Sequence, residues 1–72
     1  MIVAAREPLR VVVADDHPAY RAALARALRE NGIDVVAEAS NGEAAIRAAL
    51  ETEPDVVVMD PSEFAPPRPA IQ

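Results

Sequence analysis

Three short apolar runs alternate with two amphipathic segments, and this order restricts the fold more than any other feature of the sequence. The runs cover residues 9–14, 33–39 and 55–60 and are rich in valine, a β-branched residue that favours strands. Between them, apolar residues recur at helical spacing. Strands that alternate with helices pair in parallel through right-handed crossovers. The sequence therefore predicts an α/β fold with the order βαβαβ.

The three predicted strands differ in how they should be covered. The run 9–14 is broken only by Arg10, which favours a central strand buried on both faces. The run 33–39 alternates, with Asp34 and Glu38 on its polar face, as is typical of an edge strand. Its predicted apolar face comprises Val35, Ala37 and Ala39.

Two predicted helices have clear start and stop signals. The first begins at His17-Pro18, with Asp16 or His17 as the cap, and ends at Asn31-Gly32. The second begins at a capping box, Ser40 and Glu43, and ends at 52–54. The apolar faces are predicted to comprise Tyr20, Leu24, Ala27 and Leu28 in the first helix and Ala45, Ile46, Ala49 and Leu50 in the second. The solvated face of the first helix is predicted to comprise Arg21, Arg26, Arg29 and Glu30.

Length and composition limit the class of protein. A chain of 72 residues holds one small unit, and its 16 alanines bury little surface, so we expect a thin core. Cysteine is absent, which excludes disulfides. The net charge of -5, with arginine as the only basic residue type, argues against nucleic-acid binding by charge. Residues 1–8 carry Arg6 and only four consecutive apolar residues after Met1, which is too short a run for a signal peptide or membrane span, so we expect a cytoplasmic protein.

The predicted domain organisation has three parts. Residues 1–8 form an N-terminal extension and residues 9–60 form the folded unit. Four of the residues in 61–72 are proline, which predicts an extended or disordered tail.

Acidic side chains follow two of the predicted strands at their carboxyl ends. Asp15 and Asp16 follow the first strand, and Asp60 ends the third. With the strand order 2-1-3 these ends are neighbours, and two carboxylates about 4 Å apart repel by about 4 kcal/mol at an effective dielectric of 20. Oxygen ligands favour Mg²⁺, beside which Asp60 could act as a nucleophile toward a phosphoryl group. The alternative is that these acids are caps and solvated turn residues, and His17 is interpreted as a helix-entry residue without a catalytic role.

Three segments resemble a known family. They are LRVVVADDHPAYRAAL at 9–24, VVAEASNGEAAI at 35–46 and PDVVVMD at 54–60, and they resemble the receiver domain of bacterial two-component response regulators. The form ADDHP is similar to receivers of the LuxR or NarL type. The resemblance implies a flavodoxin-like (CheY-like) sheet in the order 2-1-3, with Asp60 as phosphoacceptor. It also implies a Mg²⁺ site formed by Asp16, Asp15, Asp60 and the backbone of Ser62, and a signalling domain rather than an enzyme.

The sequence departs from this family after Asp60. Receivers carry a Met-Pro loop with a glycine there, whereas this chain has PSEFA at 61–65. Receivers also use a lysine after a fifth strand, and this chain contains no lysine. We therefore predict the N-terminal half of a receiver, truncated after the third strand.

Two functions follow as hypotheses. In the first, the full-length parent accepts a phosphoryl group on Asp60 from a histidine kinase and regulates transcription. In the second, the chain is an interaction module without phosphoryl chemistry that forms a dimer or larger homo-oligomer through the exposed third strand. A hydrolase with an aspartyl nucleophile is a weaker alternative, because such enzymes need a second acid and a larger core or cap.

Overall fold

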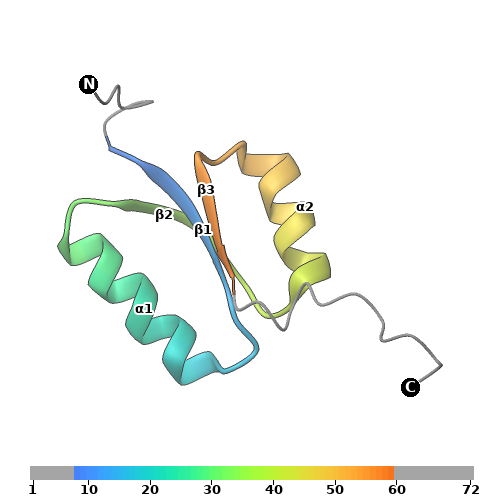
Figure 1. Ribbon diagram of the computed structural model, residues 1–72, viewed down its shortest axis with the longest axis horizontal. Helices are drawn as coiled ribbons and strands as arrows, with labels where there is room; N and C mark the ends of the chain where they lie inside the picture. Colours follow the sequence, from blue (N-terminus) through green and yellow to red (C-terminus); the bar gives the residue numbers. More distant parts are fainter. Residues whose placement is uncertain (1–7, 60–72) are drawn as a thin grey trace, which may run out of the picture.

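The computed structural model describes residues 8–59, which form a three-stranded sheet between two helices (Figure 1). The elements in chain order are β1 (Arg10–Ala14), α1 (Pro18–Glu30), β2 (Asp34–Ala39), α2 (Gly42–Thr52) and β3 (Val56–Met59). Both strand pairs are parallel, in the order β2-β1-β3. The predicted α/β class and strand order are thus confirmed. Asp60, Ser62, the predicted tail and all but the last residue of the predicted extension lie outside the described residues.

β1 is the central strand, as its nearly unbroken apolar run predicts. Its residues from Val11 to Ala14 are buried, because α1 covers one face of the sheet and α2 the other. The parallel register places Val11 opposite Val56 and Ala14 opposite Met59. The carboxyl ends of β1 and β3 therefore lie side by side, as expected for parallel strands.

The core consists of two small clusters, one under each helix. The cluster under α1 contains Val11, Val13, Ala25 and Val35, and the cluster under α2 contains Ala14, Ala39 and Ala45. The largest fully buried side chains among residues 8–59 are Val12 and Val13. The expectation of a thin core is confirmed, because alanine supplies half of the buried apolar positions in this part of the chain.

A β-bulge in β2 breaks the predicted alternation of that strand. Val11 pairs with Val35, but Val12 pairs with Ala37, so Val36 is an extra residue in β2. Because a shift by one residue exchanges the two faces of a strand, Val35 packs under α1 whereas Ala39 packs under α2. The prediction that Val35, Ala37 and Ala39 share one face is therefore wrong.

The inward face of α1 differs from the predicted one. Leu24 and Leu28 pack on the cluster beneath the helix with Ala25, whereas Tyr20 is 60% exposed and Ala27 is also exposed. The inward face instead begins with Arg21, whose side chain is only 20% exposed. Counted from Arg21, the inward residues Leu24, Ala25 and Leu28 stand at i+3, i+4 and i+7, which is the spacing of one helix face. The predicted apolar position of Tyr20 and the predicted solvated position of Arg21 are both wrong, because the two residues exchange roles.

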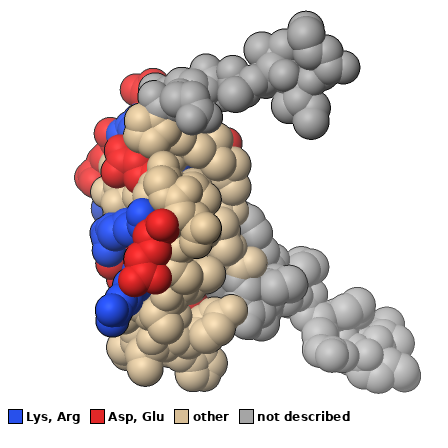
Figure 2. All heavy atoms as spheres, turned by 90° about the vertical axis from the view of Figure 1, so that its left-hand side faces the viewer, with Lys and Arg blue, Asp and Glu red and all other residues tan. Residues whose placement is uncertain are grey.

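The outer side of α1 is charged and solvated, as predicted for its remaining basic residues. Arg26 lies on this side and pairs with Glu30, one turn later, at 3.2 Å. Figure 2, which views the α1 side of the molecule, shows basic and acidic side chains gathered in a mixed stripe along one margin. Such exposed pairs contribute little to stability.

The ends of the helices follow local sequence signals with one correction. The cap of α2 is Asn41, whose Oδ1 accepts the Ala44 N–H at 2.7 Å, so the predicted cap at Ser40 is wrong. Both residue types can cap, and α2 begins one residue later than predicted. Gly32 has φ +81° and ends the turn after α1, as its lack of a side chain allows. Neither helix between residues 8 and 59 has the length and apolar character needed to cross a bilayer.

Candidate functional site

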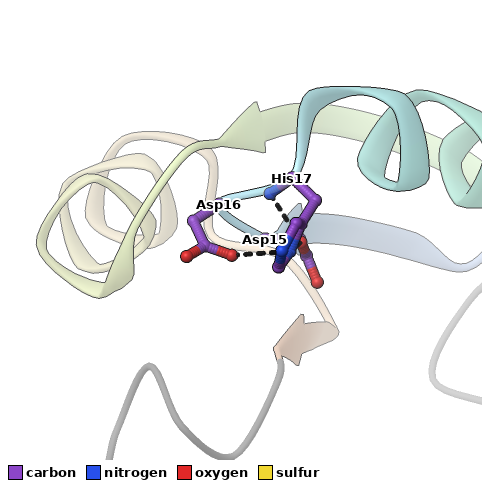
Figure 3. Close-up of side chains that lie close together, drawn as sticks. All are labelled: Asp15, Asp16 and His17. Carbon is purple, nitrogen blue, oxygen red and sulfur yellow. Dashed lines mark hydrogen bonds and ion pairs between the residues drawn. The ribbon is translucent and has the colours of Figure 1, made fainter.

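The candidate site lies where β1 ends and α1 begins, beside the carboxyl end of β3 (Figure 3). Ligands of open parallel sheets bind at this edge, between strands whose crossovers leave in opposite directions. α1 covers one face and α2 the other, so β1 and β3 form such a switch point with β2 on the far side of β1. The fold thus places the predicted acidic residues at its most favourable binding position.

Asp15 is a buried acid held on three sides. It is 4% exposed, and its N–H donates to the Ala39 carbonyl at 3.0 Å. The Asp15 carbonyl accepts the Arg21 Nη1–H at 2.7 Å, and Asp15 Oδ1 accepts the His17 N–H at 2.8 Å. Both main-chain polar groups of Asp15 are therefore hydrogen-bonded, the N–H to β2 and the carbonyl to α1, and the carboxylate is held by the N–H of His17.

Asp16 and His17 complete a group of potential ligands. The Asp16 side chain is 60% exposed, and its Oδ1 lies 2.8 Å from His17 Nδ1. The same ring nitrogen lies 3.1 Å from Asp15 Oδ1, so the imidazole joins both carboxylates (Figure 3). The three ligand atoms all lie within 4.8 Å of one another. Asp15 and Asp16 thus lie together, and the predicted convergence of both with Asp60 stays a prediction, because Asp60 lies outside the described residues.

Two residues near this group escaped the prediction from sequence. His17 was interpreted as a helix-entry residue; it is the N-cap of α1, yet its side chain contacts the acids instead of capping the helix. Its position directly after two aspartates is the signal that could have revealed this contact. The sequence pattern places Arg21 on the solvated face, and its sequence position alone does not indicate a bond to Asp15.

The donor set suits a hard cation. Asp15 and Asp16 offer carboxylate oxygens, and the ligand group contains no thiolate that would favour a softer metal. Both contacts from His17 to Asp15 use Oδ1 and leave Oδ2 to other partners. Two adjacent carboxylates, one of them buried, repel each other unless a cation or a proton offsets their charge. The residues therefore fit the Mg²⁺ ion that the sequence predicts.

The remaining predicted site residues, Asp60 and Ser62, lie outside the described residues. The last described residue of β3, Met59, pairs with Ala14, which directly precedes Asp15. The chain thus enters Asp60 from a strand whose end adjoins the acidic pair.

A second candidate surface is an apolar groove between α2 and β3. It has a volume of about 290 Å³ and is lined by Ala45, Ile46, Ala49, Leu50, Val57 and Met59. Leu50 is 77% exposed and Ile46 is 52% exposed, so half of the stripe predicted as the buried face of α2 is exposed.

A parallel βαβαβ unit with an acidic pair after its central strand defines a flavodoxin-like α/β domain with a candidate cation site. Comparisons with known proteins identify the family more closely. The sequence pattern of the response regulator receiver domain matches residues 11–62, which is more than two thirds of the chain. The chain therefore belongs to the response regulator receiver domain family.

The relatives of this chain include regulators of transcription. The transcriptional regulatory protein NarL of Mycobacterium tuberculosis is 46% identical over 55 residues, which are 75% of this chain and 26% of that protein. The signal receiver domain of NarL from the same organism has a solved structure that is 43% identical, with a TM-score of 0.72 over 76% of this chain and 45% of that chain. These matches identify a NarL-type receiver of a two-component system.

One relative contains an enzyme. A protein-glutamate methylesterase/protein-glutamine glutaminase of Haloarcula marismortui is 50% identical over 52 residues, which are 72% of this chain and only 14% of that protein. The chain thus spans about a quarter or less of the length of these curated relatives and less than half of the solved receiver. The similarity lies in the receiver, which is a signalling domain.

Proposed function

We propose that this chain supplies the phosphoacceptor and cation site of a response regulator, with Asp60 as the residue that accepts the phosphoryl group. The observation that carries the proposal is the buried Asp15 beside Asp16 at the end of β1, next to the end of β3 that leads into Asp60. Membership in the receiver family supports it independently. In this function the chain is a substrate of signalling chemistry and not an enzyme.

The residues divide the chemistry between them. Asp16, Asp15, Asp60 and the backbone of Ser62 would hold Mg²⁺, which supplies positive charge to the transferred phosphoryl oxygens. The Asp60 carboxylate forms the new P–O bond while the P–N bond of a kinase phosphohistidine breaks, and the leaving imidazole nitrogen takes up a proton. Asp15 stays anchored to Ala39 at the buried end of β1.

The test is phosphorylation of the full chain by a small acyl phosphate in the presence of Mg²⁺, followed by intact mass. We expect one added phosphoryl group in the wild type and none in Asp60→Asn. Asp16→Asn should slow the reaction by roughly tenfold or more, because the cation loses a ligand.

The matched control for this test is Asp34→Asn. Asp34 is an exposed aspartate at the opposite end of the sheet, at the start of β2, so its loss changes the net charge equally without touching the site. Phosphoryl uptake that persists in Asp60→Asn, or that falls as much in Asp34→Asn as in Asp16→Asn, would contradict the proposal.

The proposed function extends to the whole protein of which such a receiver is part. By analogy with NarL, we propose phosphorylation by a histidine kinase in the cytoplasm and regulation of transcription as the output. Within this chain we propose residues 9–60 as the folded unit, between the extension at 1–8 and the proline-rich segment 61–72.

A second candidate function is self-association through β3, favoured by the groove beside it. In the described part of the chain β3 pairs with β1 alone, and Val56 and Val57 are 42% and 36% exposed. An unpaired strand edge is a template for pairing with another chain. Antiparallel pairing of β3 with a second copy about a two-fold axis normal to the sheet keeps both α2 helices on the same face. The two apolar grooves then join into one trough, which such a dimer would shield in part from water.

Sedimentation velocity over a concentration series tests this association. We expect dimers that dissociate in Leu50→Glu, which places a charge in the groove, while Tyr20→Glu has no effect because Tyr20 lies on the α1 side. A monomer at all concentrations, or equal effects of both variants, would exclude association through this surface.

A further inference from the structure

Arg21 occupies a position that local helix preferences disfavour. It lies in the first turns of α1, where the helix dipole repels a cation, and the first turn contains no acid to offset it. It also lies on the inward face of α1, with a side chain that is only 20% exposed. Arg21 is thus a cation near the N-terminus of a helix and a charged side chain on its inward face. A residue that departs from both of these local preferences is expected to have a compensating role.

The contacts of Arg21 supply that compensation. Helical side chains point toward the N-terminus, so this guanidinium reaches back over the loop between β1 and α1. Its Nη1 donates to the Asp15 carbonyl at 2.7 Å, and its Nε lies 3.7 Å from Glu38 Oε1 on β2. One side chain thus joins α1 to both neighbouring strands at the edge where the acids lie.

Glu38 is in turn held by a second arginine. Arg29 Nη1 lies 3.7 Å from Glu38 Oε2, and Arg29 Nη2 donates to the Val35 carbonyl at 3.4 Å. Glu38 therefore lies between two guanidinium groups of α1. The bulge at Val36 makes this possible, because it turns Glu38 toward α1.

The Asp15 carbonyl belongs to the peptide group that links Asp15 to Asp16. The Arg21 bond fixes the orientation of this peptide plane, while the bond to Ala39 fixes the other side of Asp15. We propose that Arg21 is a positioning residue of the acidic site, which sets the relative placement of the Asp15 and Asp16 carboxylates before a cation binds. This role rests on the proposed function of the site, and it assigns Arg21 no contact with the cation itself.

The proposal is tested by Mg²⁺ titration of the full chain, followed through the backbone amide NMR signals of residues 15–17. Outer residues that orient metal ligands change affinity by about 10- to 100-fold when they are mutated. We expect Arg21→Gln to weaken Mg²⁺ binding by about tenfold, at the lower end of that range. Arg21→Lys should lose less, because an ammonium group can keep the bond to the carbonyl, although it cannot also reproduce the contact of Nε with Glu38.

Arg26→Gln is the matched control. It removes the same charge from the same helix, but the Arg26 side chain is 82% exposed, and within residues 8–59 its guanidinium pairs with Glu30 alone. A second readout is the carbonyl ¹³C shift of Asp15 in the metal-free chain, which reports the hydrogen bond directly. It should move in Arg21→Gln and stay unchanged in Arg26→Gln.

Three outcomes would overturn the positioning role. The first is equal Mg²⁺ affinity in wild type and Arg21→Gln, and the second is an equal loss in Arg26→Gln, which would indicate net charge alone. The third is a wild type that does not bind Mg²⁺ at residues 15–17, and that result is distinguishable because it refutes the proposed function as well. If circular dichroism shows that Arg21→Gln does not fold, the Mg²⁺ titration is made on Arg21→Lys and Glu38→Gln instead. Affinities equal to wild type in both of those variants would also overturn it.

Discussion

Shortening Val13 to alanine is expected to lower the free energy of unfolding by about 2 kcal/mol. Val13 is 0% exposed and packs with Val11, Ala25 and Val35 under α1. The change removes the equivalent of two buried methylene groups, worth about 0.8 kcal/mol each, and the small cavity left behind adds to the loss. Residues 8–59 are expected to have a total free energy of unfolding of about 3–8 kcal/mol, so this single substitution removes a large part of it.

Urea denaturation followed by circular dichroism measures this loss. The matched control is Val57→Ala, the same chemical change at a β3 side chain that is 36% exposed, for which we expect less than about 1 kcal/mol. Both variants are measured at low and high protein concentration, because a loss in Val57→Ala that grows with concentration reports association and not packing. Equal losses in the two variants at low concentration would refute the assignment of the core to β1.

Three further predictions concern the ends of the helices and the cation. Asn41→Ala should lose about 1 kcal/mol of stability in urea denaturation, and Ser40→Ala should lose nothing measurable; the reverse order would restore Ser40 as the cap. Gly32→Ala should lose about 1 kcal/mol through backbone strain at φ +81°, although no atom beyond the two neighbouring residues of the chain lies within 4 Å of the added carbon; an unchanged urea midpoint would contradict this. Mg²⁺ at ten times its Kd should stabilise the wild type by about 1.4 kcal/mol and leave Asp15→Asn unchanged, which thermal unfolding can check.

The elements of the fold could be predicted because their signals are local. Valine runs, the Pro18 start of α1 and the Gly32 stop depend on residues close in sequence, and the observed bounds agree with them within a residue or two. The strand order followed from the central strand being buried on both faces. The acidic pair was found for the same reason, since Asp15 and Asp16 directly follow the strand whose end defines the site.

Other features depend on contacts between distant residues. The half-buried position of Arg21 depends on Glu38, which is 17 positions away and faces α1 only because of the bulge. The exposure of Leu50 depends on which side chains lie above β3, and the helical spacing of apolar residues in α2 does not indicate this. The predicted cap of α2 at Ser40 is wrong for a different reason, because Ser40 and Asn41 are adjacent residues with similar capping ability.

The extra residue at Val36 makes β2 a strand with two orientations. Val35, which precedes the extra residue, packs under α1. Ala39, which follows it, packs under α2, whereas Glu38 faces α1. Regular pairing through Val36, without the bulge, would send the carboxylate that anchors Arg21 to the opposite layer. Every side chain beyond that point would then face the wrong helix. In this small sheet, the extra residue decides which helix each later side chain of β2 contacts.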